Sequence, residues 1–397
     1  MSLGESAWTL LERALAIYRD SPRADGFLRA HLARLDGPLR LALVGPPASG
    51  RSTLLDAIVG ERVTPEMDRL VVDWPGEVEL IDGGTSDADA VLFLLPQPGG
   101  ADLRALRAAH DHPIARANPV STIVVLSRAD ELGGARVDAL ISARQVARRH
   151  ARSADLRGLC VDVVAVAGLL ALAGATLTAP EFSVLDQLGT VPKGDLEPFL
   201  LSADRFAGSG FPAPLPADVR AALLARFGVF GVRVAVGLVR RGFRGHSALA
   251  AELVRTSGIG DLRESIGVCF ADRAGVLKAR TALIALDIVL RMEPRQAAGP
   301  VAADLERIVA SAHELREVRL LAGLRTGRVA LGDAGEEARY LVGGHGIGPA
   351  QRLAMSGDAY QAVLRWRAYA EAPHLGDAER RAVAVVVRSC EELVAAP

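Results

Sequence analysis

The sequence predicts an α/β head, with a mixed and mainly parallel sheet, joined to an α-helical bundle or stalk. Six short apolar runs separated by turns and helical patterns lie between residues 39 and 167, as expected for a sheet covered on both faces. From about Pro180 these runs stop, and helical periodicity rich in Ala, Leu, Arg and Glu continues to the C-terminus. Residues 39–60 read as a buried strand, a glycine-bounded loop and the start of a helix.

Composition sets the broad class of protein. The chain has 397 residues, and 50% of them are hydrophobic, which is enough for two or three domains with buried cores. The 46 basic and 47 acidic residues nearly cancel, so we expect no nucleic-acid partner. The three cysteines lie far apart without a CxxC pair, and the N-terminus lacks the pattern of a signal peptide. We therefore expect a cytoplasmic protein with neither a zinc site nor a disulfide framework.

Residues 1–38 are predicted to form helices that pack on the stalk. Apolar residues recur there at steps of three and four, at Trp8, Leu11, Leu15 and Tyr18. A second short helix is predicted from Phe27 to Leu35. Helices this short are marginal alone, so both need an apolar partner.

The head is predicted over residues 39–205. Its strands are the apolar runs LRLALV, RLVVDW, EVELI, DAVLFLL, STIVVL and VDVVAVA. Pro75-Gly76 suits a two-residue turn, so the second and third runs are predicted to form an antiparallel hairpin. The apolar stretch 163–177 is shorter than the roughly 20 residues of a membrane-spanning helix, and we interpret it as a core strand followed by a buried helix start.

The stalk is predicted over residues 206–397. One long helix is expected from Ser257, as its N-cap, to a break at Pro294. Shorter helices are expected at about 301–324, 351–371 and 378–394. The apolar segment 226–245 ends in arginines that suit anionic lipid headgroups, but we favour a helix connecting head and stalk. For GGHGIG at 343–348 we favour a glycine turn over an anion cradle.

The loop at residues 45–52, G-P-P-A-S-G-R-S, matches the phosphate-binding pattern GxxxxG[KR][ST]. Its backbone amides from the fourth position onward, with the positive end of the following helix, would face the β- and γ-phosphates. The residues predicted to bind phosphate are Gly45, Ser49, Gly50, Arg51, Ser52 and Thr53. The Ser52 hydroxyl is also predicted to hold magnesium. An ordinary glycine turn is the alternative interpretation.

Arg51 stands where this pattern normally has lysine. Lysine is a compact point charge that reaches back over the loop, whereas a guanidinium is wider and planar, so the replacement is not conservative. We expect weaker nucleotide affinity and a misplaced charge during phosphoryl transfer.

Two later strand ends predict that the nucleotide is GTP or GDP. Ser127-Arg128-Ala129-Asp130 is a variant of the [NT]KxD element, in which the carboxylate accepts two hydrogen bonds from guanine and the basic stem covers the ring. Arg128 and Asp130 are therefore predicted to bind guanine, and the backbone N–H of Ala167 is predicted to meet the guanine oxygen. An exposed Arg–Asp loop is the alternative interpretation of the first element.

The motifs needed for GTP hydrolysis match their expected patterns less well than the motifs for binding, and no catalytic residue is predicted. Asp82 is the carboxylate expected on the magnesium side, but the expected DxxG reads D-G-G-T. In the loop ERVTPEMDR, Thr64 is the one hydroxyl that could complete the magnesium sphere. Only GGTSDA separates Asp82 from the next strand, so both segments that would sense the γ-phosphate are short.

Over nearly its whole length, this chain resembles the bacterial dynamin-like proteins. More narrowly, it resembles their isoniazid-inducible branch in actinobacteria. The resemblance rests on the stretches LALVGPPASGRSTLLDAIVGERVTP, VVLSRADELGGARVDAL, VAGLLALAG and TSGIGDLRESIGVCFADRAGVLKARTALIAL. It places Gly45, Gly50, Arg51, Ser52 and Thr53 in the phosphate loop, Asp82 on the magnesium side, and Arg128 and Asp130 in the guanine-reading element.

This resemblance implies a GTPase head that binds GTP or GDP with Mg²⁺ and a helical stalk built from both chain ends. It also implies a homo- or hetero-oligomer with a related dynamin-like protein, peripheral contact with the inner face of the plasma membrane, and membrane remodelling or maintenance. Because Arg51 and both short loops surround the same γ-phosphate, the first hypothesis is a degenerate GTPase that binds nucleotide weakly and acts with a related partner. The alternatives are an active GTPase that needs dimerisation for turnover, and a nucleotide-independent scaffold.

Overall fold

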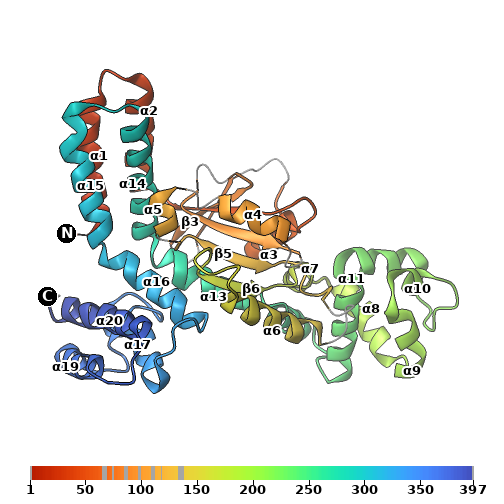
Figure 1. Ribbon diagram of the computed structural model, residues 1–397. Helices are drawn as coiled ribbons and strands as arrows, with labels where there is room; N and C mark the ends of the chain where they lie inside the picture. Colours follow the sequence, from red (N-terminus) through yellow and green to blue (C-terminus); the bar gives the residue numbers. More distant parts are fainter. Residues whose placement is uncertain are drawn as a thin grey trace.

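Six strands form one sheet at the centre of the part of the chain that the computed structural model describes, residues 2–64, 69–73, 76–84, 88–96, 100–108, 112–117, 119–132 and 138–395 (Figure 1). The strands are β1 (Leu39–Val44), β2 (Arg69–Asp73), β3 (Glu77–Asp82), β4 (Ala90–Leu95), β5 (Thr122–Leu126) and β6 (Asp162–Ala165). Their order is β2-β3-β1-β4-β5-β6. Every neighbouring pair is parallel except β2 and β3.

Each of the six apolar runs corresponds to one of these strands, and the mixed, mainly parallel α/β head is confirmed. The antiparallel pairing of the second and third runs is confirmed as well, since Val71 pairs with Glu79 in the β2–β3 ladder. Pro75, the first residue of the expected turn, lies outside the described residues. The stretch 163–177 contains the end of β6 and the buried helix α7 (Gly168–Ala175), as expected.

Helices cover both faces of the sheet. Successive side chains of a strand point to opposite faces, so Leu92 and Leu94 join one apolar cluster while Phe93 and Leu95 join another. The first cluster includes α3 (Arg51–Val59), α13 (Ile259–Ile266) and α14 (Ala274–Met292). The second includes α4 (Gly100–Ala108) and α6 (Ala139–Arg152). Short α5 (Pro113–Ala117) contributes Ile114 to the first cluster.

An upright bundle at one end of the sheet contains both early and late parts of the chain (Figure 1). Its helices are α1 (Leu3–Tyr18), α2 (Pro22–Arg34), α14 and α15 (Gly299–Ser311), with the short η3 (Gln296–Ala298) between the last two. At its tip the Tyr18 hydroxyl donates to the Glu293 carbonyl oxygen at 2.8 Å. Asp89, just before β4, accepts from Arg34 at 3.0 Å and from the Arg40 backbone N–H at 3.1 Å, which ties α2 to the sheet.

The long helix expected from Ser257 to Pro294 is wrong, because the chain turns within it. α13 ends at Ile266, a π-helical turn η2 (Gly267–Ala271) follows, and α14 begins only at Ala274. Arg273 at this break is 5% exposed and donates to the carbonyl oxygens of Val342 and Gly343. Contacts with a distant segment therefore fix a break that the helical periodicity of the sequence does not contain.

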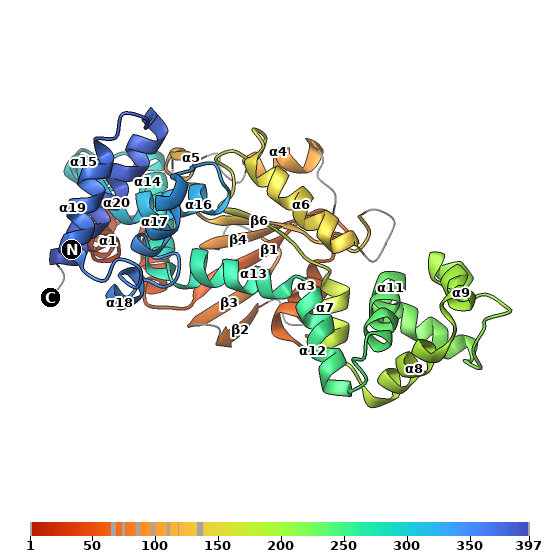
Figure 2. The same cartoon turned by 90° about the horizontal axis from the view of Figure 1, so that it is seen from below.

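The remaining helices form two further groups, so the predicted stalk is not one bundle. The group beyond the far end of the sheet contains α8 (Ala179–Thr190), α9 (Lys193–Leu196), η1 (Glu197–Leu201), α10 (Ala203–Ala207) and α11 (Ala217–Arg240). α11 packs on α8, which lies before the predicted boundary at residue 205, and on α10, which spans that boundary. α12 (His246–Thr256) runs back along α7 to α13 (Figure 2).

The C-terminal group packs around buried Trp366. Its elements are α16 (His313–Arg325), η4 (Gly332–Ala334), α17 (Gly335–Leu341), α18 (Pro349–Arg352), α19 (Ala359–Ala370) and α20 (Asp377–Ala395). The single helix expected at 301–324 is divided into α15 and α16, because the backbone at Ala312 (φ −56°, ψ 105°) is not helical.

Candidate nucleotide site

The loop between β1 and α3 has the form that the phosphate pattern predicts. Ala48 and Gly50 have positive φ, at 60° and 85°, and the Ser49 N–H closes a turn on the Pro46 carbonyl oxygen at 3.1 Å. Gly45 is required by close packing, since an added Cβ would lie 2.7 Å from Ser49 Oγ and 2.9 Å from the Leu94 carbonyl oxygen. The loop is thereby pressed against the end of β4.

The first turn of α3 presents unused hydrogen-bond donors. Gly50 is the N-cap and gives no side-chain cap, and the first amide of this turn to find an acceptor is that of Leu54, which donates to the Gly50 carbonyl oxygen at 2.8 Å. The amides of Gly50 through Thr53 donate to no group in the described ranges. Four free N–H groups and the positive end of the helix favour an anion at this point.

Arg51 and Asp82 lie beside each other at the edge of the loop. The Nε of Arg51 is 3.7 Å from Oδ1 of Asp82, with the two side chains 38% and 28% exposed, so the pair is weak. Gly83 donates its N–H to the Leu43 carbonyl oxygen at 3.0 Å, which fixes the end of β3 next to β1. The position of a Cβ on Gly83 would be 3.3 Å from Nη1 of Arg51, so the guanidinium extends toward the end of β3.

Among the described residues, no hydrogen bond links Thr64 to this loop. Thr64 is exposed and makes no hydrogen bond with the rest of the described chain. Thr85, the fourth residue of D-G-G-T, lies outside the described residues. Within the described part, Gly83 and Gly84 carry positive φ, at 83° and 72°.

The predicted guanine-reading element follows β5. Arg128 pairs with Ala167 in an isolated bridge, so the ends of β5 and β6 lie side by side. The Arg128 side chain is exposed and forms an ion pair with Glu131. Burial raises the pKa of the Asp130 carboxyl, although its own backbone N–H and Arg128 act in the opposite direction. A carboxylate in this state gains stability from added N–H donors, such as those on the edge of guanine.

The Ala167 N–H that was expected to meet guanine is already used within the chain. It donates to the Ser257 carbonyl oxygen at 2.9 Å. The neighbouring Gly258 has φ 83° and fits tightly, since an added Cβ would lie 2.4 Å from the Ala165 carbonyl oxygen. The expectation of a free donor therefore needs correction, because the α12–α13 junction closes on the end of β6.

Comparison with known proteins gives one relationship that spans the chain. The isoniazid-induced protein IniC of Mycobacterium tuberculosis, from strain CDC 1551 / Oshkosh and from strain H37Rv, is 32% identical over 488 aligned residues, covering 100% of this chain and 99% of the relative. The chain belongs to the isoniazid-induced IniC family. Since it has only 397 residues, at least 91 aligned positions fall opposite gaps in it. No protein-family model matches the chain.

Unpartnered oxygen atoms gather at the carboxyl edge of the sheet in this IniC-family chain. Within the described residues, five buried side-chain oxygens accept or donate no hydrogen bond, and three of them are Ser49 Oγ, Asp82 Oδ1 and Ser127 Oγ. Ser49 and Ser127 follow β1 and β5, and Asp82 is the last residue of β3. Buried polar atoms without partners are rare in folded proteins, so a concentration of them at one place points to a ligand, ion or water there.

Two residues at this edge, Ser127 and Ser257, were not predicted to belong to the site. Ser127 was noted only as the first residue of its four-residue element, and its buried Oγ becomes evident only from the packing of β5 against β4, where its N–H donates to the Leu95 carbonyl oxygen at 3.2 Å. Ser257 is far in the sequence from the strand ends that form this edge. In the structure, the positive φ of the following Gly258, 83°, marks a turn at this point. No short sequence pattern connects Ser257 with Ala167.

In the part of the chain that the structure describes, neither the cysteines nor a cluster of metal ligands forms a second site. Burial raises the pKa of each cysteine thiol, Cys160, Cys269 and Cys390, to about 12, so none is a reactive thiolate. Within the described ranges no group of three or more His, Cys, Asp or Glu side chains is arranged to hold a metal ion.

Helix α11 is long and apolar enough to cross a membrane by length and composition, and 56% of its apolar window is buried in the protein. The bent pair α7 and α8, at 113°, passes the same test only when counted together. Arg240 at the end of α11 donates to the carbonyl oxygens of Gly189 and Val191 at 3.3 and 2.6 Å. In this IniC-family chain α11 is thus the core helix of the α8–α11 group.

Proposed function

We propose that this chain is a dynamin-like protein that binds GTP or GDP at the carboxyl edge of its sheet and hydrolyses GTP slowly or not at all. The observation that carries the proposal is that the free α3 amides and three buried oxygens without hydrogen bonds lie at the same edge of the sheet. An anionic ligand with hydrogen-bond donors and acceptors would satisfy both sets.

The phosphates would lie on the amides of Gly50 through Thr53. Mg²⁺ prefers oxygen ligands, and the Ser52 hydroxyl and Asp82 Oδ1, which accepts no hydrogen bond, fit such an ion. When bound, Mg²⁺ would neutralise phosphate charge. Arg51 competes for the same carboxylate at 3.7 Å, which is a physical reason for a weakened dependence on the metal.

The base would lie against Asp130, with the stem of Arg128 over the ring. Guanine offers two N–H donors to the Asp130 carboxylate, and this would offset the rise that burial causes in the pKa of that carboxyl. The Ala167 N–H takes no part in this proposal, since it donates to the Ser257 carbonyl oxygen.

Slow hydrolysis is proposed because nothing in the described residues positions an attacking water. Thr64 makes no hydrogen bond with the phosphate loop, and the guanidinium of Arg51 lies toward β3. Phosphoryl transfer depends on positioning and electrostatic stabilisation. The positions of Thr64 and Arg51 therefore lower the rate of hydrolysis more than they weaken nucleotide binding. In the alternative, a partner protein supplies the missing group in trans, and turnover then rises with protein concentration.

The relationship to IniC supports action together with a related protein, in a homo- or hetero-oligomer. We propose further that the protein is cytoplasmic, contacts the inner face of the plasma membrane peripherally and takes part in its remodelling or maintenance. Sedimentation with liposomes, in the presence and absence of GTP, tests the membrane part of this proposal. Absence of the protein from the pellet under both conditions would contradict it.

Titration with a fluorescent GTP analogue tests nucleotide binding itself. We expect saturable binding by the wild type and at least tenfold weaker binding by Asp130→Asn, which loses the carboxylate that reads guanine. Asp155→Asn is the matched control, because the Asp155 side chain is 71% exposed on the surface of the head. Phosphate release is expected to be slow in the wild type and faster in Arg51→Lys. Rapid wild-type turnover would overturn the degenerate-GTPase proposal, and no binding of GTP or GDP would favour a nucleotide-independent scaffold.

A further inference from the structure

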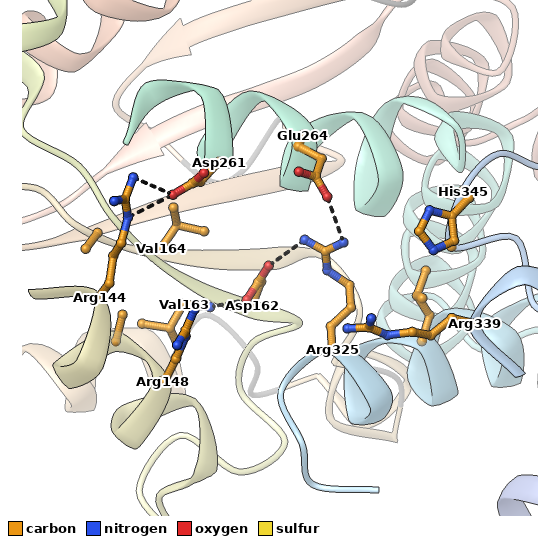
Figure 3. Close-up of a pocket in the computed structure, with 14 residues that line it drawn as sticks. Arg144, Arg148, Asp162, Val163, Val164, Asp261, Glu264, Arg325, Arg339 and His345 are labelled. Atoms are coloured by element: carbon orange, nitrogen blue, oxygen red, sulfur yellow. Dashed lines mark hydrogen bonds and ion pairs between the residues drawn. The ribbon is translucent and has the colours of Figure 1, made fainter. Parts of the chain in front are cut away.

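A polar cavity of about 300 Å³ runs along β6, which is the last strand of the sheet (Figure 3). Its walls come from α6 and β6 of the head, from α13, and from α16, α17 and the loop after α17 in the C-terminal group. An adjoining cavity of about 530 Å³ shares Glu264, Gly344 and His345 with it. The volume of the cavity along β6, about 300 Å³, is at the lower end of the range for small-molecule pockets.

The acidic groups on these walls already have cationic partners. Asp261 accepts from Arg144 at 3.0 Å, and Asp162 accepts from Arg325 at 3.1 Å. Glu264 lies 3.6 Å from the same Arg325 guanidinium. A cation entering the cavity would have to displace these arginines, so the walls are not built for a metal or an amine.

Basic groups, in contrast, remain with free donors. Arg148 is exposed at the rim and makes no ion pair or hydrogen bond with any described residue. Arg339 uses Nη1 for Glu336, which is not part of the wall, and keeps its other N–H groups. The Nε of Arg325 is buried without an acceptor. A guanidinium carries five N–H donors, so the cavity holds a surplus of donors and of positive charge.

Figure 3 shows these groups on facing sides of one space, with Arg144 and Arg148 on α6 and with Arg325 and Arg339 on the opposite side. The glycines after α17 do not cradle the ligand. The Gly343 and Gly344 amides donate to the Tyr340 and Arg339 carbonyl oxygens at 2.8 and 2.7 Å and so close the helix. Any anion would therefore be held by the arginine side chains.

We propose that this cavity binds a small anion bearing a phosphate group, which bridges the head and the C-terminal helical group. Guanidinium forks match phosphate oxygens in geometry and form charge-assisted hydrogen bonds with them. The anion would also relieve the repulsion among arginines that converge from three helices. The site is separate from the proposed nucleotide site, because it lies along the free edge of β6, and neither proposal depends on the other.

Calorimetric titration with inorganic pyrophosphate at low ionic strength tests the site. We expect binding by the wild type and at least tenfold weaker binding by Arg148→Gln and by Arg339→Gln. Arg149→Gln is the matched control, since Arg149 is the exposed neighbour on the same helix and does not line the cavity, and its affinity should stay within twofold. Thermal unfolding of each variant confirms that it is folded.

The phosphate loop is the competing site for pyrophosphate, and Arg51→Ala reports on it. If the affinity falls in Arg148→Gln and Arg339→Gln but persists in Arg51→Ala, the cavity is the site. If wild type shows no binding, if only Arg51→Ala loses it, or if Arg149→Gln loses as much as Arg148→Gln, the proposal is overturned. Sedimentation with vesicles of phosphatidylcholine and phosphatidic acid distinguishes the source of the phosphate. Retention that depends on Arg148 and Arg339 indicates a lipid headgroup, and its absence indicates a soluble molecule.

Discussion

Replacing Glu317 by Gln is expected to lower the stability of the C-terminal group strongly at neutral pH. Glu317 is 3% exposed and accepts from Arg352 and from the Ser389 hydroxyl, the latter at 2.6 Å. Arg273 lies 3.5 Å away and His313 3.6 Å away. The carboxylate therefore joins the break before α14 to α16, α18 and α20, and an amide in its place leaves the guanidinium groups of Arg273 and Arg352 without their anion.

The size of the effect follows from the pKa of Glu317. Burial acts to raise it, but hydrogen bonds from His313 and Ser389 and the charges of Arg352 and Arg273 outweigh burial and lower the pKa from 4.5 to about 2. A shift of this size corresponds to about 3 kcal/mol of stability. Because the folded pKa is depressed, this contribution is present above pH 4.5 and disappears as the pH falls toward 2. Burial lowers the pKa of Arg273, but arginine stays protonated throughout this window and does not shift it.

Urea unfolding followed by the fluorescence of Trp366 is the assay, since this tryptophan is buried in the same group. When Trp8 and Trp74 are replaced by Phe, Trp366 is the remaining tryptophan, and its fluorescence follows the unfolding of the C-terminal group. A loss of about 3 kcal/mol moves the midpoint by about 1 to 3 M urea. Glu306→Gln, at an exposed position on α15, is the control and should move it little. Equal shifts of both variants at pH 7, or a difference between wild type and Glu317→Gln that is unchanged at pH 3, would contradict a stabilising role of the Glu317 carboxylate.

Three further predictions concern the proposed nucleotide site. Gly45→Ala places a Cβ 2.9 Å from a carbonyl oxygen of β4 and should cost about 1 to 3 kcal/mol in urea unfolding, with loss of nucleotide binding; unchanged stability would show that the loop can shift. Arg51→Lys removes the guanidinium beside Asp82 and should make nucleotide affinity depend more steeply on Mg²⁺, measured with and without EDTA; equal dependence in both proteins would contradict this. Gly258→Ala, with φ 83° and a Cβ 2.4 Å from the Ala165 carbonyl oxygen, should lower Tm by several degrees in calorimetry, and an unchanged Tm would mean that the junction is loosely packed.

The strands were predictable because each is a short apolar run between turns, and β1 matches its run LRLALV residue for residue. The phosphate loop was predictable because its glycines and hydroxyls are close in sequence, and the structure places Gly45 through Thr53 on the expected strand, loop and helix. Local chemistry determines these features, so a local pattern reveals them.

Features fixed by distant contacts were not predictable. The amphipathic pattern runs without interruption through Arg273, yet the helix breaks there because that side chain binds carbonyl oxygens after α17. The hydrogen bond from Ala167 to Ser257 and the cavity shared by Arg148, Arg325 and Arg339 likewise join segments that are far apart in the chain. Only the folded arrangement brings such groups together.

Isothermal titration calorimetry with GTP, GDP and ATP, each with and without Mg²⁺, decides whether this IniC-family protein binds guanine nucleotides. We expect saturable heat with GTP and GDP, little heat with ATP, and loss of the guanine signal in Asp130→Asn. Equal binding of ATP would contradict the role of Asp130 in reading guanine. An absence of heat with every nucleotide would contradict the assignment of the free α3 amides and the unpartnered Ser49, Asp82 and Ser127 oxygens to a nucleotide site.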